Sequence, residues 1–180
     1  TKEVNEALEA FRFNDAALTV YKFIWNEYCD WYIELTKSKL TDPGWKRVAA
    51  QNMLIHVLDS ALKLLHPFMP FITEEIWQKL PQNEDSIMVS AFPEYREAQT
   101  NEAIEKEMAV IMEVITGIRN IRGEMNLNPG LKLNVLVKTQ NSAIQQTLQY
   151  HGEYIRELAR VEQLETGPNI KKPKVSASSV

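Results

Sequence analysis

A chain of 180 residues is long enough for one large domain or two small ones, and its composition is ordinary for a globular protein, with 44% hydrophobic and 24% charged residues. Only 6 glycines and 8 prolines are present, which excludes collagen-like, low-complexity and fully disordered classes. The net charge of -4 does not indicate a nucleic-acid binder, because phosphate binding usually leaves a basic footprint. The one cysteine excludes an internal disulfide, and no apolar run is long enough to predict a membrane span.

Most of the chain is patterned as helices. Apolar residues at helical spacing predict helices over 2–11, 15–39, 45–65, 73–80 and 101–123. The break at 41–44 is short, so the helices on either side of it are expected to be antiparallel neighbours in a bundle. Pro67 and Pro70 separate the third helix from a fourth, whose expected N-cap is Thr73.

Residues 81–100, between the last two of these helices, read as a loop with a short extended piece at 87–91. After residue 125 the pattern changes from helical to mixed. This part contains predicted strands at 131–137 and 161–164, with helices at 141–150 and 154–160. Residues 171–180 are either a strand whose partner is missing or a frayed end. The predicted fold class is mainly α: an antiparallel helical bundle over 1–125, followed by a small α/β segment over 126–180.

Residues that carry catalysis or bind metals are not clustered. The three histidines His56, His66 and His151 are scattered, and Cys29 lies among aromatic residues with no histidine nearby in sequence. Glycine-rich phosphate-binding motifs are absent, and residues 36–39 resemble a KMSKS loop only weakly. We therefore predict no catalytic, cofactor-binding or metal-binding residue in this chain.

Aromatic residues gather near the N-terminus, where eight of the sixteen lie between residues 11 and 32. Such rings can form a stacking platform for unpaired bases, or they can fill the core of a bundle. Helical periodicity places Tyr21, Tyr28 and Trp31 on the apolar stripe of the 15–39 helix and therefore predicts that they are core residues. Phe23 and Trp25 lie off this stripe.

Two segments carry a family resemblance. Residues 23–35 (FIWNEYCDWYIEL) and 64–80 (LLHPFMPFITEEIWQKL) closely resemble the C-terminal helical domain of valyl-tRNA synthetases. Residues 11–21 and 115–129 fit the same domain in the same order, so the resemblance covers about residues 3–165. Isoleucyl, leucyl and methionyl enzymes carry looser versions of the proline-rich junction, whereas the run around Trp31 narrows the resemblance to the valine enzymes.

The resemblance implies the anticodon-binding domain of a class Ia ligase that joins valine to its tRNA, with ATP and Mg²⁺ used by a catalytic domain outside this chain. It implies catalytic and editing domains before Thr1 as partners in cis, and a coiled-coil arm after Val180. We expect valine tRNA as a partner, no membrane, a monomer, and a cytoplasmic location. The alternatives are a structural bundle that docks on other protein domains, and the equivalent domain of isoleucyl-tRNA synthetase.

Candidate tRNA contacts follow from residue chemistry, since cations hold phosphates and rings stack on splayed bases. The basic residues beside the break and at the end of the 101–123 helix are the expected phosphate contacts, and an aromatic residue is expected near the bases. These candidates are Lys37, Lys39, Lys46, Arg47, Arg119 and Arg122 for phosphate, with Phe13 or Trp45 for bases. Cations in a last helical turn also offset the helix dipole, which is the competing explanation for the two arginines. Trp31 and Trp77 are expected to fill the core.

Overall fold

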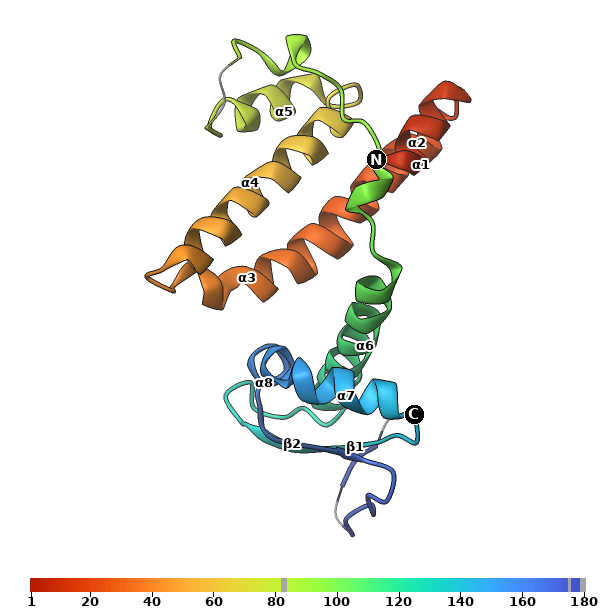
Figure 1. Ribbon diagram of the computed structural model, residues 1–180, viewed down its shortest axis with the longest axis vertical. Coiled ribbons are helices and arrows are strands. Elements are labelled where there is room, and N and C mark those ends of the chain that lie inside the picture. The colour runs from red at the N-terminus through yellow and green to blue at the C-terminus, as the bar shows by residue number, and fades with distance from the viewer. Residues whose placement is uncertain (82–83, 175, 179–180) are drawn as a thin grey trace. The chain divides into compact units, whose positions relative to one another are not determined.

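The computed structural model describes residues 1–81, 84–174 and 176–178, which form two compact units, Thr1–Ala98 and Gln99–Val180 (Figure 1). The sequence predicts a boundary at residue 125, whereas the two compact units divide between Ala98 and Gln99. The difference arises because the long helix over 102–124 packs against the helices that follow it in the C-terminal unit.

The N-terminal unit is helical. Its elements are α1 (Lys2–Glu9), α2 (Phe13–Lys22), a π-helix (Phe23–Tyr32), α3 (Ile33–Leu40), α4 (Trp45–Leu65), α5 (Pro70–Trp77) and short 3₁₀ turns at Ile87–Val89 and Glu97–Gln99. The segments α2, π-helix and α3 follow one another without a break, and α4 packs against α3 to form a helical hairpin (Figure 1). The predicted helical bundle is confirmed.

The predicted apolar stripe of the 15–39 helix is wrong in its first part. Tyr21 is 58% exposed, and the buried residues of α2 are Ala16 and Val20. These small side chains allow α1 to pack closely against α2, so one core of the unit joins them to Val4 and Leu64.

The middle of the same helical run is a π-helix, whose hydrogen bonds span five residues instead of four. A stripe drawn with the α-helical period therefore drifts around this segment. Tyr28 is buried as predicted, at 7% exposure, but Trp31 is only half-buried. The hydroxyl of Tyr28 donates a hydrogen bond of 3.1 Å to the carbonyl of Leu54 on α4.

The junction between α4 and α5 turns one helix into the next. Helix α5 begins at Pro70, three residues before the expected N-cap, because proline is favourable at the first helical position. Thr73 is consequently inside the helix and buried, and its hydroxyl donates to the carbonyl of Met69 at 2.8 Å. Trp77 is 1% exposed and packs with Leu62, which confirms its predicted place in the core.

The extended piece expected at 87–91 is a 3₁₀ turn at Ile87–Val89. The side chain of Ser86 accepts a hydrogen bond from the backbone N–H of Met88, which closes the turn, and Ile87 is buried in the same core as Trp77. Ile87 is thus buried by a turn and not by a strand, and alternation of residue types in the sequence does not distinguish the two.

The C-terminal unit is the predicted α/β segment together with α6. Its elements are α6 (Glu102–Glu124), β1 (Leu133–Lys138), α7 (Ser142–Tyr150), α8 (Gly152–Ala159) and β2 (Val161–Gly167). The strands are parallel, with Val135 opposite Leu164, and α7 and α8 connect them. Asn101 and Asn141 cap α6 and α7 by accepting hydrogen bonds from backbone N–H groups of the first turn.

Helix α6 is amphipathic as predicted from Ile111 onward. Ile111, Ile115 and Ile118 are buried, and α6 packs against α7 and α8. Ile104, in the first turn, is 57% exposed. The described part of the tail, 171–174 and 176–178, contains no strand. Among the residues described, no helix is long and apolar enough to cross a bilayer.

Candidate nucleic-acid interface

Four of the six predicted phosphate contacts meet at the end of the α3–α4 hairpin. Helix α3 ends at Leu40 and α4 begins at Trp45, so the four residues between them bring the two helix ends together (Figure 1). The turn is held locally, since the side chain of Asp42 accepts a hydrogen bond of 2.7 Å from the N–H of Gly44. We call the group formed by Lys37, Lys39, Trp45, Lys46 and Arg47 the basic tip.

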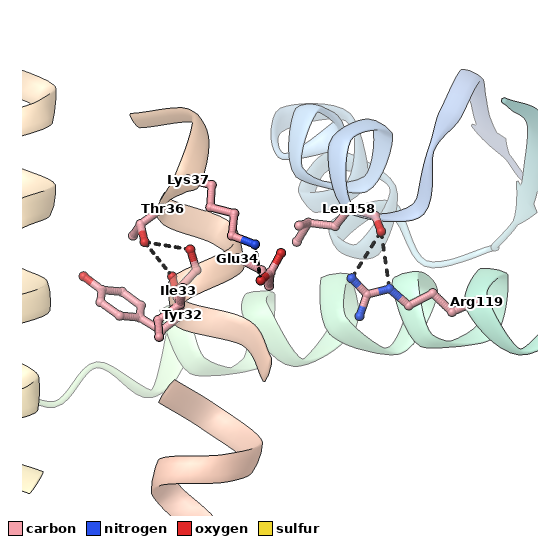
Figure 2. Close-up of polar contacts among 7 residues, drawn as sticks. All are labelled: Tyr32, Ile33, Glu34, Thr36, Lys37, Arg119 and Leu158. Atoms are coloured by element: carbon pink, nitrogen blue, oxygen red, sulfur yellow. Dashed lines mark hydrogen bonds and ion pairs between the residues drawn. The ribbon is translucent and has the colours of Figure 1, made fainter. Parts of the chain in front are cut away.

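The charges of the basic tip differ in how they are paired. Lys37 forms an exposed ion pair with Glu34, one turn earlier on α3 (Figure 2). Lys46 and Arg47 are exposed in the first turn of α4, and neither forms an ion pair within the described residues. Both cations lie at the N-terminal end of a 21-residue helix, where the helix dipole is positive. The first turn contains no acidic residue that would offset this positive charge. This arrangement is unfavourable for the helix and favourable for binding an anion.

Trp45 supplies an aromatic surface at the same place. It is the first residue of α4 and is 76% exposed, so its indole ring is available to solvent. Val48 and Met53, farther along α4, are also at least half exposed. A ring beside several cations is the combination that binds an unstacked base together with its flanking phosphates.

Phe13 lies far from the basic tip. It is the first residue of α2, and the helical run from Phe13 to Leu40 extends about 40 Å at ~1.5 Å per residue. Its half-exposed ring contacts the ring of Phe11 edge-to-face, with centroids 6.2 Å apart. Arg12 between them is paired with Asp15 at 2.7 Å.

Phe11 is a candidate that the sequence analysis missed. Its ring is 79% exposed and its φ is 57°, a left-handed conformation that is uncommon for a bulky residue. The available signal was the Phe-Arg-Phe run at the junction of two predicted helices. Among the exposed aromatic residues, we therefore treat Trp45 and the Phe11–Phe13 pair as the two candidate aromatic surfaces.

Arg119 and Arg122 lie in the other unit and contact backbone carbonyls. Arg119 donates from Nε and Nη2 to the carbonyl of Leu158, at 3.3 and 3.2 Å, near the end of α8 (Figure 2). Arg122 donates from Nη1 to the carbonyl of Leu131 at 2.8 Å and from Nη2 to that of Asn128 at 3.0 Å. Both guanidinium groups therefore help to hold the C-terminal unit together, whatever else they bind.

Tyr28 and Glu74 have shifted pKa values with clear structural causes. Burial raises the pKa of Tyr28, and hydrogen bonds from Gln78 and Ser86 lower the pKa of Glu74. Both shifts are explained by packing and hydrogen bonds within the unit. Within residues 1–81, 84–174 and 176–178, His, Cys, Asp and Glu side chains do not form a group of three that could hold a metal ion.

Comparison with known families agrees with a nucleic-acid interface on this fold. The family model described as the anticodon-binding domain of tRNA ligase matches residues 1–137. The chain therefore belongs to the family of anticodon-binding domains of tRNA ligases. The matched segment contains the basic tip, both aromatic surfaces, Arg119 and Arg122.

The curated relatives that the chain resembles are valine–tRNA ligases. The chain is 44% identical over 181 residues to the valine–tRNA ligase of Geobacter sulfurreducens, and 43% identical over 178 residues to that of Fervidobacterium nodosum. It is 38% identical over 180 residues to the valine–tRNA ligase of Lactiplantibacillus plantarum. Each alignment covers 99% of this chain but only 19–20% of the relative, so the chain spans about one fifth of the length of these ligases.

Proposed function

We propose that this chain is the tRNA-binding module of a valine–tRNA ligase and holds the anticodon stem and loop of valine tRNA. The observation that carries the proposal is the basic tip, in a chain that belongs to the anticodon-binding family. Attachment of valine, with ATP and Mg²⁺, is then the task of catalytic and editing domains in the rest of the ligase. We further propose that the ligase acts in the cytoplasm as a monomer.

The chemistry of the tip suits a single-stranded loop. Lys46 and Arg47 form no ion pair with a carboxylate of the described residues, so they can bind phosphate oxygens directly. Lys37 has to leave Glu34, which costs about 0.5 kcal/mol or less because the pair is exposed. A base that splays out of the loop can then stack on the indole of Trp45.

The anticodon loop could bind at Trp45 or at Phe13, and the distance between these two residues means that it binds at only one of them. Trp45 and Phe13 lie near opposite ends of a helical run about 40 Å long, so one loop base does not reach both. We place the loop at Trp45 because Lys46 and Arg47 beside it form no ion pair within the described residues, whereas Arg12 beside Phe13 is paired with Asp15. If Phe13→Ala lost anticodon discrimination and Trp45→Ala kept it, we would assign the loop to the α1–α2 junction instead.

The test compares valine tRNA with the same transcript carrying an isoleucine anticodon, using fluorescence anisotropy at moderate salt. We expect the 180-residue chain to bind the valine transcript weakly, with a Kd of roughly 10⁻⁴–10⁻⁶ M. Equal binding of both transcripts contradicts anticodon reading by this chain. Stronger binding of the isoleucine form supports the isoleucine enzyme instead, which the names of the relatives do not favour.

Charge reversal at the tip distinguishes RNA binding from a purely structural role. Lys46→Glu with Arg47→Glu should weaken binding at least tenfold, because two phosphate contacts become repulsions. The matched control reverses Lys79 and Lys106, two exposed cations that are not part of the basic tip and that pair with Glu75 and Glu102. If the tip variant binds as tightly as the control, a structural bundle that docks on protein domains is the better explanation.

A further inference from the structure

The C-terminal unit has its own group of cations where β1 and β2 begin. Arg122 on α6 donates to the carbonyl of Leu131, and the N–H of Leu133 donates to the carbonyl of Arg160 at 3.1 Å. Lys132 lies between Leu131 and Leu133 and is therefore flanked by both arginine contacts. We call Arg122, Lys132 and Arg160 the strand-start cations.

Arg160 has an unusual backbone. It follows the last residue of α8 with φ 53° and ψ 54°, the left-handed position at which helices commonly place glycine. A residue with a Cβ is less favourable there than glycine. The Arg160 side chain is exposed, so burial of the side chain does not offset this conformation. An unfavourable backbone that carries an exposed charge is a reason to look for a function.

The charges of this group are not neutralised by carboxylates. In the described part of the chain, none of the strand-start cations forms an ion pair. Arg122 is held by carbonyls, which fix its guanidinium without cancelling the positive charge. Lys132 and Arg160 are exposed and project from backbone that the β1–β2 pairing holds in place. Three uncompensated cations on a fixed scaffold in an otherwise acidic chain form a local anion-binding surface.

We propose that the strand-start cations form a second phosphate-binding surface, on which Lys132 and Arg160 contact the sugar-phosphate backbone of tRNA. Arg122 acts as a positioning residue, because its contact to the carbonyl of Leu131 holds the residue before Lys132. The ligand is identified as RNA backbone by its charge and by the tRNA-ligase family of the chain, so this inference rests on the proposed function. These contacts add affinity without reading bases.

Two variants separate binding from folding. Arg160→Gly removes the charge and also relieves the left-handed backbone, so its melting temperature should equal or exceed that of the wild type while its tRNA affinity falls. Lys132→Gln removes a charge next to the strand start, and Lys138→Gln is the matched control at the other end of β1. The two lysines are six residues apart, or roughly 20 Å along the strand.

The measurement is Kd for the valine transcript as a function of salt, with melting temperatures by circular dichroism. Arg160→Gly and Lys132→Gln should each weaken binding about two- to fivefold and reduce the salt slope by roughly 0.7–0.9, whereas Lys138→Gln should match the wild type. Unchanged binding in both, or an equal loss in Lys138→Gln, overturns this inference. If the tip variant still weakens binding in that case, the proposed function stands; if the wild type does not bind tRNA, both fall.

Discussion

Tyr28 shows how one residue connects the aromatic-rich segment to the rest of the bundle. Its ring is buried while Tyr21, two helical turns earlier, is exposed, and its hydroxyl reaches the carbonyl of Leu54 on α4. Burial, and to a smaller extent the neighbouring Cys29 and Tyr32, raises the pKa of the phenol, so the hydroxyl stays protonated and donates over a wide pH range. Tyr28 is the buried residue of the π-helix and thereby links this segment to α4.

Removing that hydroxyl tests the link between the π-helix and α4. Tyr28→Phe keeps the ring but leaves the carbonyl of Leu54 without this donor, so the free energy of unfolding should fall by about 0.5–1.5 kcal/mol. Urea unfolding followed by circular dichroism measures the change. The matched control is Tyr150→Phe, because Tyr150 is 85% exposed and should show no loss. Equal stability of the two variants contradicts a structural role for the Tyr28 hydroxyl.

Among the elements, α5 depends on Glu74 for its contact with the turn at Ile87–Val89. Oε2 of Glu74 accepts from the hydroxyl of Ser86 at 2.8 Å and from the N–H of Ile87 at 3.2 Å, and Oε1 accepts from Gln78 at 2.7 Å. Hydrogen bonds to the charged form explain why the pKa of Glu74 is lowered. The carboxylate thus holds Ile87 in the core beside Trp77.

The sign of the pH dependence follows from this lowered pKa. Glu74 contributes its full stabilisation above the ordinary pKa of an unfolded glutamate, and this stabilisation is lost as the pH falls through the lower folded pKa. Glu74→Gln should therefore melt at a lower temperature than the wild type at neutral pH, and the difference should shrink in acid. Melting curves across pH measure this convergence. Glu75→Gln, which removes an exposed ion pair with Lys79, is the control, and a constant difference for Glu74→Gln across pH opposes the assignment.

For the molecule as a whole, the distribution of charge matters more than its sum. The net charge is -4, yet Lys46 and Arg47 in one unit and the strand-start cations in the other form no ion pair with any residue that the structure describes. Local clusters suffice for phosphate binding because charges beyond a Debye length of roughly 10 Å are screened at 0.1 M salt. An acidic chain can therefore bind RNA.

This balance predicts a strong salt dependence for the complete chain. Binding to the valine transcript should weaken steadily as salt rises, with a log-log slope that counts the phosphate contacts at about 0.7–0.9 each. Circular dichroism over the same salt range should show an unchanged fold, which separates lost contacts from unfolding. Affinity that is independent of salt would mean that the cations of this chain do not hold phosphates.

The sequence by itself determined the family, the helical class and most element positions. Helix α4 and the C-terminal strands lie where periodicity predicted them, because helical repeats and branched alternating residues act over a few neighbouring positions. The proline-rich junction is a similarly local signal. The four cations beside the break were also recognisable, since a short turn brings its two ends together whatever the rest of the fold does.

Tertiary structure alone decided which faces are buried and what the charged groups contact. Periodicity placed Tyr21 in the core, but close packing of α1 buries Ala16 and Val20 instead, and the π-helix shifts the faces that follow. No local pattern links Arg122 to the carbonyl of Leu131 or sets Arg160 in a left-handed conformation. The hydrogen bonds from Tyr28 to Leu54 and from Arg119 to Leu158 join residues 26 and 39 positions apart, and their energies depend on geometry that forms only when the chain has folded.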